Sequence, residues 1–142
     1  MREALAAAVE AAAVGDVPVG AVVMHDGAVL SRASNRTVRD QDPTAHAEIL
    51  AMREAARALG QWRLDECTLV VTLEPCAMCA GAIVLARLNA LVFGAWDDKA
   101  GMAGSVGDIV RHHRLNHQPQ VTGGVLADEC AALLSTFFRD RR

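Results

Sequence analysis

The spacing of apolar residues changes several times along the chain, and each spacing predicts a different element. Residues 2–14 are rich in alanine at helical spacing and predict a helix. Two short apolar runs follow, over 19–24 and 28–34, and a His-Asp-Gly sequence at 25–27 separates them. Apolar runs joined by Asp-Gly predict a β-hairpin directly after the first helix.

From residue 42 onward, helical and extended patterns alternate. Asp42 followed by Pro43 predicts a helix start, because the Asp side chain can cap free amides and proline needs no amide donor there. The expected elements are a helix over 45–59, a strand over 68–73, a helix over 76–88, a strand over 91–94, a short helix ending near 114, a strand over 121–125 and a helix over 127–139. This alternation, without a repeat or linker, predicts a single α/β domain over 1–142, a three-layer α/β/α sandwich with a central mixed sheet of about five strands.

Composition narrows the class of protein and its compartment. The 142 residues can bury a core, since 52% are hydrophobic and 22% are charged, and no stretch is apolar enough to cross a bilayer. Glu3 and Glu10 interrupt the N-terminal apolar residues, which argues against a secretory signal, so we expect a cytoplasmic protein without membrane contact. The net charge of −3 gives no overall basic field, so any RNA contact must come from a local patch.

Four cysteines in a chain without an export signal favour metal or redox chemistry over disulfides. Cys76 and Cys79 lie three apart at a predicted helix start, so they share a face, and the free amides and helix dipole there stabilise thiolate. His46, at another helix start, supplies a neutral imidazole nitrogen. Three protein ligands leave one position of a tetrahedral Zn²⁺ open, which is typical of a catalytic site with one zinc per chain.

Glu48 lies two residues from His46 and can reach a water in that open position. Zinc lowers the pKa of such a water towards neutrality, so hydroxide is available to attack a ring carbon that bears an amino group. Glu48 is predicted to take the water proton, protonate the ring nitrogen and later protonate the departing ammonia. Glu74 is the next candidate for this proton shuttle.

Each half of this motif has a simpler interpretation. C-x-x-C alone also occurs in redox disulfides and structural zinc sites, and Cys67 or Cys130 could complete a structural site. We expect both to be buried packing residues instead, because Cys67 begins a strand and Cys130 lies in a late helix. A thioredoxin-like pair would not explain H-x-E, and a lone H-x-E is common on helix surfaces. The two motifs together, each opening a helix, are much more specific.

Together the motifs resemble the signature of the zinc-dependent nucleobase deaminases. Over almost the whole chain the sequence resembles the bacterial tRNA-specific adenosine deaminases, through the segments Asp42-Pro-Thr-Ala-His-Ala-Glu, Thr72-Leu-Glu-Pro-Cys-Ala-Met-Cys-Ala-Gly-Ala, Phe93-Gly-Ala, Asp98-Lys-Ala-Gly-Met-Ala-Gly-Ser, Leu115-Asn-His and Glu129-Cys to Phe137-Phe-Arg. The resemblance implies a cytidine deaminase-like fold and conversion of adenosine to inosine at the wobble position of an arginine tRNA (tRNA-Arg) anticodon. It also implies a homodimer in which neighbouring subunits complete the RNA surface.

The resemblance further implies which residues meet the RNA. Asn35 would hydrogen-bond the flipped base, and Val19 would line its pocket. The residues that would meet flanking nucleotides are Lys99, Asn116, Phe138, Arg139, Arg141 and Arg142. Plainer alternatives are a turn residue for Asn35, a loop lysine, a solvated arginine tail, and core packing for one phenylalanine of the Phe137–Phe138 pair. Trp96 stands where the family often has a polar or basic residue, and it would either stack on a base or cover a subunit contact.

Three functions remain open at this point. The leading hypothesis is an enzyme that edits adenosine in a tRNA anticodon loop. A deaminase of a free base or nucleotide, of guanine, cytosine or cytidine type, would carry the same zinc motif, and only a substrate can separate the two. A catalytically silent RNA-binding scaffold is the third, and the presence of Glu48 argues against it.

Overall fold

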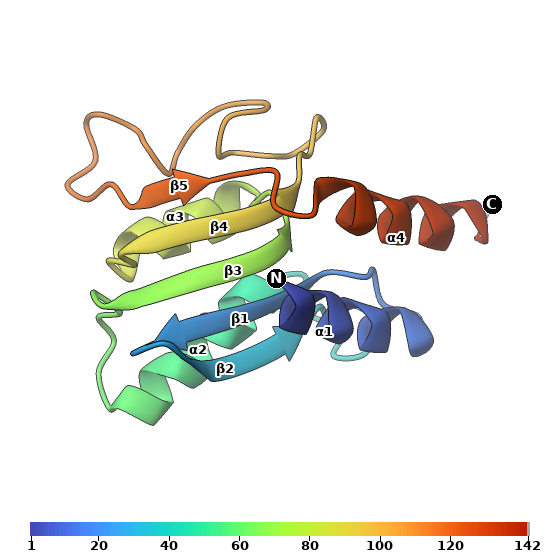
Figure 1. Cartoon of the computed structure of the whole chain (residues 1–142), viewed down its shortest axis with the longest axis horizontal. Helices are drawn as coiled ribbons and strands as arrows, with labels where there is room; N and C mark the ends of the chain where they lie inside the picture. Colours follow the sequence, from blue (N-terminus) through green and yellow to red (C-terminus); the bar gives the residue numbers. More distant parts are fainter. Residues whose placement is uncertain (142) are drawn as a thin grey trace.

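A computed structural model describes residues 1–141, which form one sheet with helices on both of its faces (Figure 1). The elements in chain order are α1 (Arg2–Ala13), β1 (Gly20–His25), β2 (Ala28–Ser34), α2 (Ala47–Leu59), β3 (Cys67–Leu73), α3 (Ala77–Leu85), β4 (Ala90–Ala95), β5 (Gln120–Thr122) and α4 (Ala127–Arg139). The predicted α/β fold with a mixed sheet of five strands is confirmed. Arg142, which the sequence places at an RNA surface, lies outside the described residues.

The strands lie in the order β2-β1-β3-β4-β5. β1 pairs antiparallel with both β2 and β3, whereas β3, β4 and β5 are parallel to one another. The β1–β2 hairpin turns at Asp26 and Gly27, whose φ angles of 50° and 76° match the left-handed pair that a tight two-residue turn requires. Because β3 and β4 run in register to Leu73 and Ala95, the segments that follow these two strands emerge side by side.

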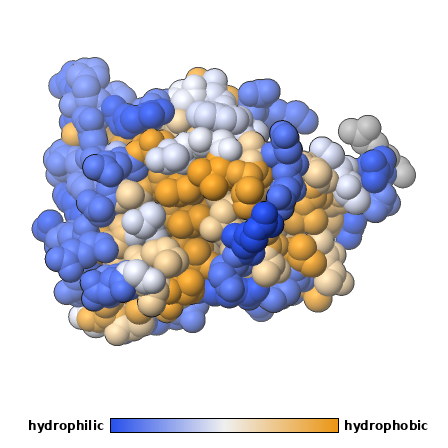
Figure 2. Space-filling view, in the orientation of Figure 1, coloured by the Kyte–Doolittle hydropathy of each residue, from blue (hydrophilic) through white to orange (hydrophobic). Residues whose placement is uncertain are grey.

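The two faces of the sheet are covered by different helices. In Figure 1, α2 and α3 lie behind the sheet, and α1 and α4 lie at its near side. Residues at every second position of a strand point to the same face, and the main core forms on the side of α2 and α3, where Leu69, Val71 and Phe93 join Ala51 and Ile83. Figure 2 shows apolar side chains over the middle of the near face and hydrophilic ones along its left edge.

The remaining expectations for the core and chain can be checked directly. Cys67 and Cys130 are both buried free thiols, which confirms their predicted packing role. Phe137 is buried while Phe138 is half exposed, so one member of that pair packs in the interior as expected. Within the described residues, no helix has the length and hydropathy needed to span a membrane.

Two local predictions were wrong. α2 begins at Ala47 with His46 as its N-cap, and Asp42 caps no helix. Instead the Asp42 Oδ1 accepts hydrogen bonds from the Thr44 amide (2.8 Å) and hydroxyl (2.7 Å), which closes a turn within the loop. The expected helix ending near residue 114 is also absent from the described chain, which forms turns over that stretch. There the Asp108 carboxylate accepts from the Arg111 amide at 3.0 Å and holds a local turn.

Candidate active site

The His46, Cys76 and Cys79 side chains meet where two helices begin. His46 is the N-cap of α2 with extended backbone angles (φ −75°, ψ 149°), and Cys76 is the N-cap of α3. Cys79 lies in the first turn of α3 and is fully buried. The His46 Nδ1 atom is 3.6 Å from the Cys76 Sγ and 3.5 Å from the Cys79 Sγ. The structure therefore brings together the three residues that the sequence predicts as metal ligands.

These distances can be tested against a metal ion. In a tetrahedral zinc site with Zn–S of about 2.3 Å and Zn–N of about 2.05 Å, each sulfur lies about 3.6 Å from the nitrogen. The observed separations agree with that value, and one ligand atom from each residue lies within 4.8 Å of the others. A soft S₂N donor set of this size fits Zn²⁺, because two thiolates and an imidazole are ligands that zinc prefers. The group could hold one metal ion.

The hydrogen bond between the two cysteines shifts their pKa values in opposite directions, since it lowers the pKa of Cys76 and raises that of Cys79. A hydrogen bond from the Cys79 thiol, supported by the His46 ring and opposed by burial, lowers the pKa of Cys76 to about 3. The Cys76 thiolate in turn raises the pKa of His46, chiefly through their hydrogen bond. One thiolate is thus already formed at neutral pH, and a metal ion would displace the remaining protons.

Glu48 lies in the first turn of α2, two residues after the His46 cap, and only 4% of it is exposed. Its Oε2 accepts a hydrogen bond from the Cys79 thiol at 3.4 Å. Removal of the carboxylate from water raises the pKa of Glu48. A carboxyl group with a raised pKa, held beside a metal-ligand set, is suited to take up and return a proton.

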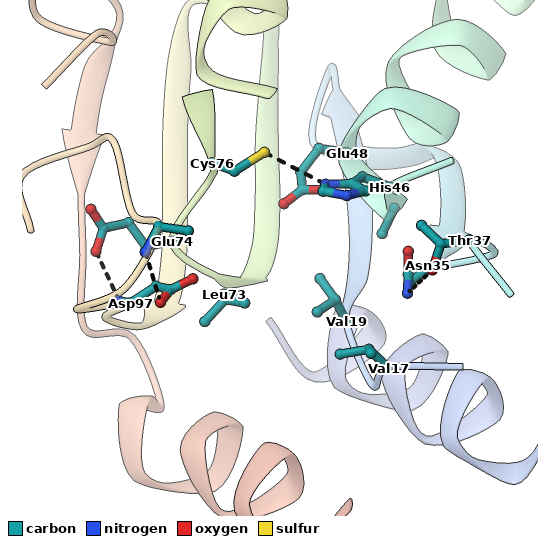
Figure 3. Close-up of a pocket in the computed structure, with 12 residues that line it drawn as sticks. Val17, Val19, Asn35, Thr37, His46, Glu48, Leu73, Glu74, Cys76 and Asp97 are labelled. Carbon is teal, nitrogen blue, oxygen red and sulfur yellow. Dashed lines mark hydrogen bonds between the residues drawn. The ribbon is translucent and has the colours of Figure 1, made fainter. Parts of the chain in front are cut away.

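A cavity of about 220 Å³ opens onto this group. Its lining residues are Val17, Val19, Asn35, Thr37, His46, Ala47, Glu48, Leu73, Glu74, Cys76, Asp97 and Ala100. In Figure 3, His46, Glu48 and Cys76 lie at one end, with Val17, Val19, Asn35 and Thr37 on one side and Leu73, Glu74 and Asp97 on the other. The predicted pocket residues Val19 and Asn35 both line this cavity.

A buried carboxylate holds the side of the cavity formed by Val19 and Asn35. The Asp16 side chain has no solvent exposure, and its two oxygens accept from the Val38 amide (2.7 Å) and the Arg39 Nε (2.8 Å). Arg39 also donates to the Asn35 carbonyl at 3.1 Å. The Asn35 amide donates to the Val19 carbonyl at 2.9 Å, so the loop before β1 and the loop after β2 form one wall.

A second buried carboxylate holds the opposite side. Glu74 is 1% exposed, and its oxygens accept hydrogen bonds of 3.0 Å each from the amides of Asp97, Ala103 and Ser105, and one from the Ser105 hydroxyl. Burial raises the pKa of Glu74, but these hydrogen bonds outweigh it and place the pKa below its usual range. The carboxylate is thus fully engaged with the loop after β4, which leaves Glu48 as the acid–base candidate.

The residues predicted to meet flanking nucleotides fall in two places. Lys99, Phe138, Arg139 and Arg141 line a groove at the end of α4, next to the cavity. Asn116 is exposed at the other end of the sheet, where its neighbour His117 contacts the Leu88 carbonyl just before β4 (Nε2···O 2.6 Å). The structure brings the first group together and does not bring Asn116 to the cavity.

Several lining residues were not singled out from the sequence. Thr37, Leu73 and Asp97 all line the cavity, and Asp16 holds one wall from behind. Leu73 is the last residue of the predicted strand over 68–73, and Asp97 lies three positions beyond the predicted strand over 91–94. Residues at the carboxyl ends of adjacent parallel strands commonly line ligand sites, and this signal could have identified them.

A three-layer α/β/α fold with a His-Cys-Cys donor group and a buried glutamate over a cavity defines the class of metal-dependent nucleobase deaminases. The chain belongs to the MafB19-like deaminase family, which it matches over residues 1–142. It is similar to the tRNA-specific adenosine deaminases of Bacillus subtilis (strain 168), at 49% identity over all of this chain and 88% of that protein, and of Haemophilus influenzae, at 49% identity over all of this chain and 83% of that protein.

Solved structures agree with this family. One from a study of A-to-I editing by tRNA:A34 deaminases at the wobble position has a TM-score of 0.89 and 43% identity, and the match covers 94% of this chain and 97% of that one. The guanine deaminase from Nitrosomonas europaea has a TM-score of 0.82 and 28% identity, over 94% of this chain and 80% of that one. The same fold and a similar sequence thus accompany two different purine substrates.

Proposed function

We propose that this chain is an enzyme that converts adenosine to inosine by hydrolytic deamination at the wobble position of a tRNA anticodon, with tRNA-Arg as its substrate. The observation that carries the proposal is the buried Glu48 carboxylate beside a His46, Cys76 and Cys79 group of zinc dimensions. The identity of about half to the tRNA-specific adenosine deaminases, over the full chain, supports the choice of substrate.

His46, Cys76 and Cys79 would hold one Zn²⁺ per chain. The ion, when bound, supplies a Lewis acid that lowers the pKa of water and makes hydroxide available near neutral pH. The protein contributes the positions of the two cysteines at the start of α3, where free amides and the helix dipole stabilise thiolate. It also contributes the extended backbone of His46, which precedes the first turn of α2.

Glu48 moves the protons of the reaction. Its carboxylate takes a proton from the attacking water and delivers one to the ring nitrogen next to the carbon that bears the amino group. Glu48 then takes the proton of the new hydroxyl group on that carbon and passes it to the leaving amino nitrogen as the C–N bond breaks, so that water is consumed and ammonia is released. The burial that raises the pKa of Glu48 brings its proton affinity closer to the working pH for both transfers.

The depth of the cavity requires the base to leave its stack. Glu48 and Cys79 are buried, so an adenine inside a duplex could not reach them, whereas the bases of an anticodon loop are already partly unstacked. Asn35 supplies a side-chain amide for the base edge, and its Nδ2 now donates to the Thr37 hydroxyl at 3.3 Å. Val19 supplies an apolar surface for one face of the ring.

Flanking nucleotides would meet the groove that Lys99, Phe138, Arg139 and Arg141 line, with Arg142 following in the chain. The groove combines cations for phosphates with an exposed aromatic ring for a base, as in proteins that bind single-stranded RNA. Asn116 lies at the other end of the sheet from the cavity. In the proposal it therefore contacts RNA that is bound to a neighbouring subunit.

We also propose that the enzyme is a cytoplasmic homodimer. An apolar groove of about 360 Å³ runs between α2 and α3, and the exposed Trp62 and Leu85 side chains line it. Exposed apolar surface of this kind is typical of a subunit interface. A second copy of this chain covers the groove in the proposal, and sedimentation velocity of the purified protein tests it, since a monomer at micromolar concentration would contradict it.

The experiment that tests the activity is incubation with unmodified arginine tRNA followed by nucleoside analysis. Inosine at the wobble position is the expected product, and the Glu48→Ala variant is the matched control. Free guanine and cytidine are assayed alongside, because guanine deaminase from Nitrosomonas europaea shares this fold at 28% identity. Faster turnover of a free base than of the tRNA would replace the proposed substrate, and no turnover of any substrate would indicate the silent scaffold.

A further inference from the structure

Trp96 follows β4 directly, beside the mouth of the cavity. About half of its side chain (52%) is exposed. The next residue, Asp97, lines the cavity, and its amide is fixed by the 3.0 Å hydrogen bond to the Glu74 Oε1. The Glu74 amide donates in turn to the Ala95 carbonyl at 2.8 Å. The backbone on both sides of Trp96 is therefore held in place.

The Trp96 ring contacts Phe93 on one side, and Trp96 is half exposed to solvent. It packs edge-to-face on the buried Phe93 ring, with centroids 4.8 Å apart and an interplanar angle of 89°. A side chain at Gly123 would begin 2.8 Å from the Trp96 Cζ2 and 2.5 Å from the Phe93 Cζ, so only glycine leaves room for both rings. A large, half-exposed ring with a rigid support is thus built into this edge of the cavity.

A groove that Trp96 lines adjoins the cavity over Glu48. A groove of about 460 Å³ is lined by Trp96, Lys99 and Phe138, and it shares Val17, Leu73 and Asp97 with the lining of the cavity. Phe138, 48% exposed, presents a second aromatic ring from α4. When the reacting nucleotide of an RNA strand enters the cavity, the adjacent nucleotide would lie along this groove.

The lining of this groove carries Asp97, Asp98 and Lys99, and an adjoining groove that shares Lys99 and Phe138 adds the cations Arg139 and Arg141. Among residues 1–141 the Lys99 side chain forms no ion pair, and Arg139 has only a distant contact with Asp140 (3.8 Å). The Asp97 Oδ1 is engaged by the Lys99 amide at 3.0 Å and the Ala100 amide at 3.2 Å, which offsets its negative charge. Free cations next to exposed aromatic rings are typical of single-strand binding grooves.

We propose that Trp96 is the stacking platform for the nucleotide adjacent to the flipped adenosine. The inference rests on the proposed function and names the element that recognises the neighbour of the reacting base. Trp96 touches RNA away from the reacting atoms, so it contributes to binding the substrate and leaves the chemical step unchanged. It accepts any base, because every base offers a flat face.

A double-substitution cycle tests the stacking directly. The substrates are an anticodon stem–loop and two versions with an abasic site immediately 5′ or 3′ of the target adenosine. The enzymes are the unaltered protein and its Trp96→Leu variant, which retains Trp62. On the intact stem–loop, Trp96→Leu should raise KM about fivefold or more. With one of the abasic substrates this effect should fall to less than about twofold.

Equal effects of Trp96→Leu on all three substrates would overturn the proposal. Trp96→Phe should recover most of the affinity, and zinc content and the melting temperature should match the parent in both variants. A shift in sedimentation coefficient without coupling to an abasic site would show that Trp96 covers a subunit contact, which also overturns it. If the unaltered protein deaminates no RNA, the proposed function fails, and the part of the tryptophan fluorescence that Trp96→Leu removes decides this inference separately: quenching of that part by the stem–loop supports it and constant emission refutes it.

Discussion

The Glu74→Gln variant tests how much the Glu74 carboxylate, which holds the loop after β4, contributes to the stability of the protein. Each Glu74 oxygen accepts two hydrogen bonds, so replacing either oxygen with an NH₂ group leaves at least one buried backbone amide without an acceptor. An unsatisfied buried donor costs about 1–3 kcal/mol, and the hydrogen bonds that remain each lose about 1 kcal/mol of charge assistance. We expect Glu74→Gln to lower the free energy of unfolding by about 3–5 kcal/mol at pH 7.

The direction of the Glu74 pKa shift determines how the stability difference between the parent and Glu74→Gln changes with pH. Hydrogen bonds to the loop keep the pKa of Glu74 in the folded protein below its usual value of 4.5. The stabilisation is therefore complete well above the unfolded pKa and is lost as the pH falls through the folded pKa. Glutamine does not titrate, so the difference between the parent and Glu74→Gln should shrink steadily below pH 4.5.

Urea unfolding of both proteins at a series of pH values measures this difference. Glu54→Gln is the matched control, because Glu54 is exposed on α2 and its side chain forms no ion pair within residues 1–141. That variant should stay within about 0.5 kcal/mol of the parent. A Glu74→Gln protein as stable as the parent at pH 7, or a difference that is the same at every pH, would refute the argument from the hydrogen bonds.

Four further predictions follow from the site. Cys76→Ala should lose bound zinc and thermal stability together, as measured by metal analysis and melting, and full zinc occupancy would remove Cys76 from the ligand set. Glu48→Ala should keep zinc and fold but lose about 10²–10⁴-fold or more in kcat, whereas a retained rate would place the proton shuttle elsewhere. Asn35→Ala should lower kcat more than it raises the Kd for the stem–loop, because Asn35 would touch only the flipped base. Gly101→Ala should lower the melting temperature, since its Cβ would lie 2.3 Å from the Glu74 carboxyl carbon, and Gly81→Ala, with open space around it, should not.

The sequence predicts most of the elements because their signals are local. The Asp-Gly turn specifies the β1–β2 hairpin, which begins and ends within a residue of its predicted bounds. The final helix matches its predicted range of 127–139, since acidic residues in the first turn and an apolar stripe mark it. The metal-ligand group is likewise predictable, because the spacing of Cys76 and Cys79 and the position of His46 each have a direct geometric meaning.

The errors have a common physical origin in side chains that bond the nearby loop. The Asp42–Pro43 pair has the composition of a helix start, but the Thr44 amide and hydroxyl already satisfy Asp42, so the helix begins later. That delay gives His46 its extended backbone and places its ring next to Cys76. Asp108 similarly replaces a helix with a turn. A capping residue in the sequence does not show whether its side chain will begin a helix or close a turn within a loop.

The walls of the cavity are held by Asp16 on one side and Glu74 on the other, chiefly through hydrogen bonds from backbone amides. Of these two framing carboxylates only Glu74 also lines the cavity, so the frame and the lining share a single side chain. Lining residues such as Val19, Asn35 and Leu73 can change in size or polarity without moving the loops that carry them. Changes in the lining alone could therefore adapt the same fold to a different purine substrate, in keeping with the guanine deaminase of similar fold. It also indicates where redesign for a new base should begin, at the lining, with the two framing carboxylates left intact.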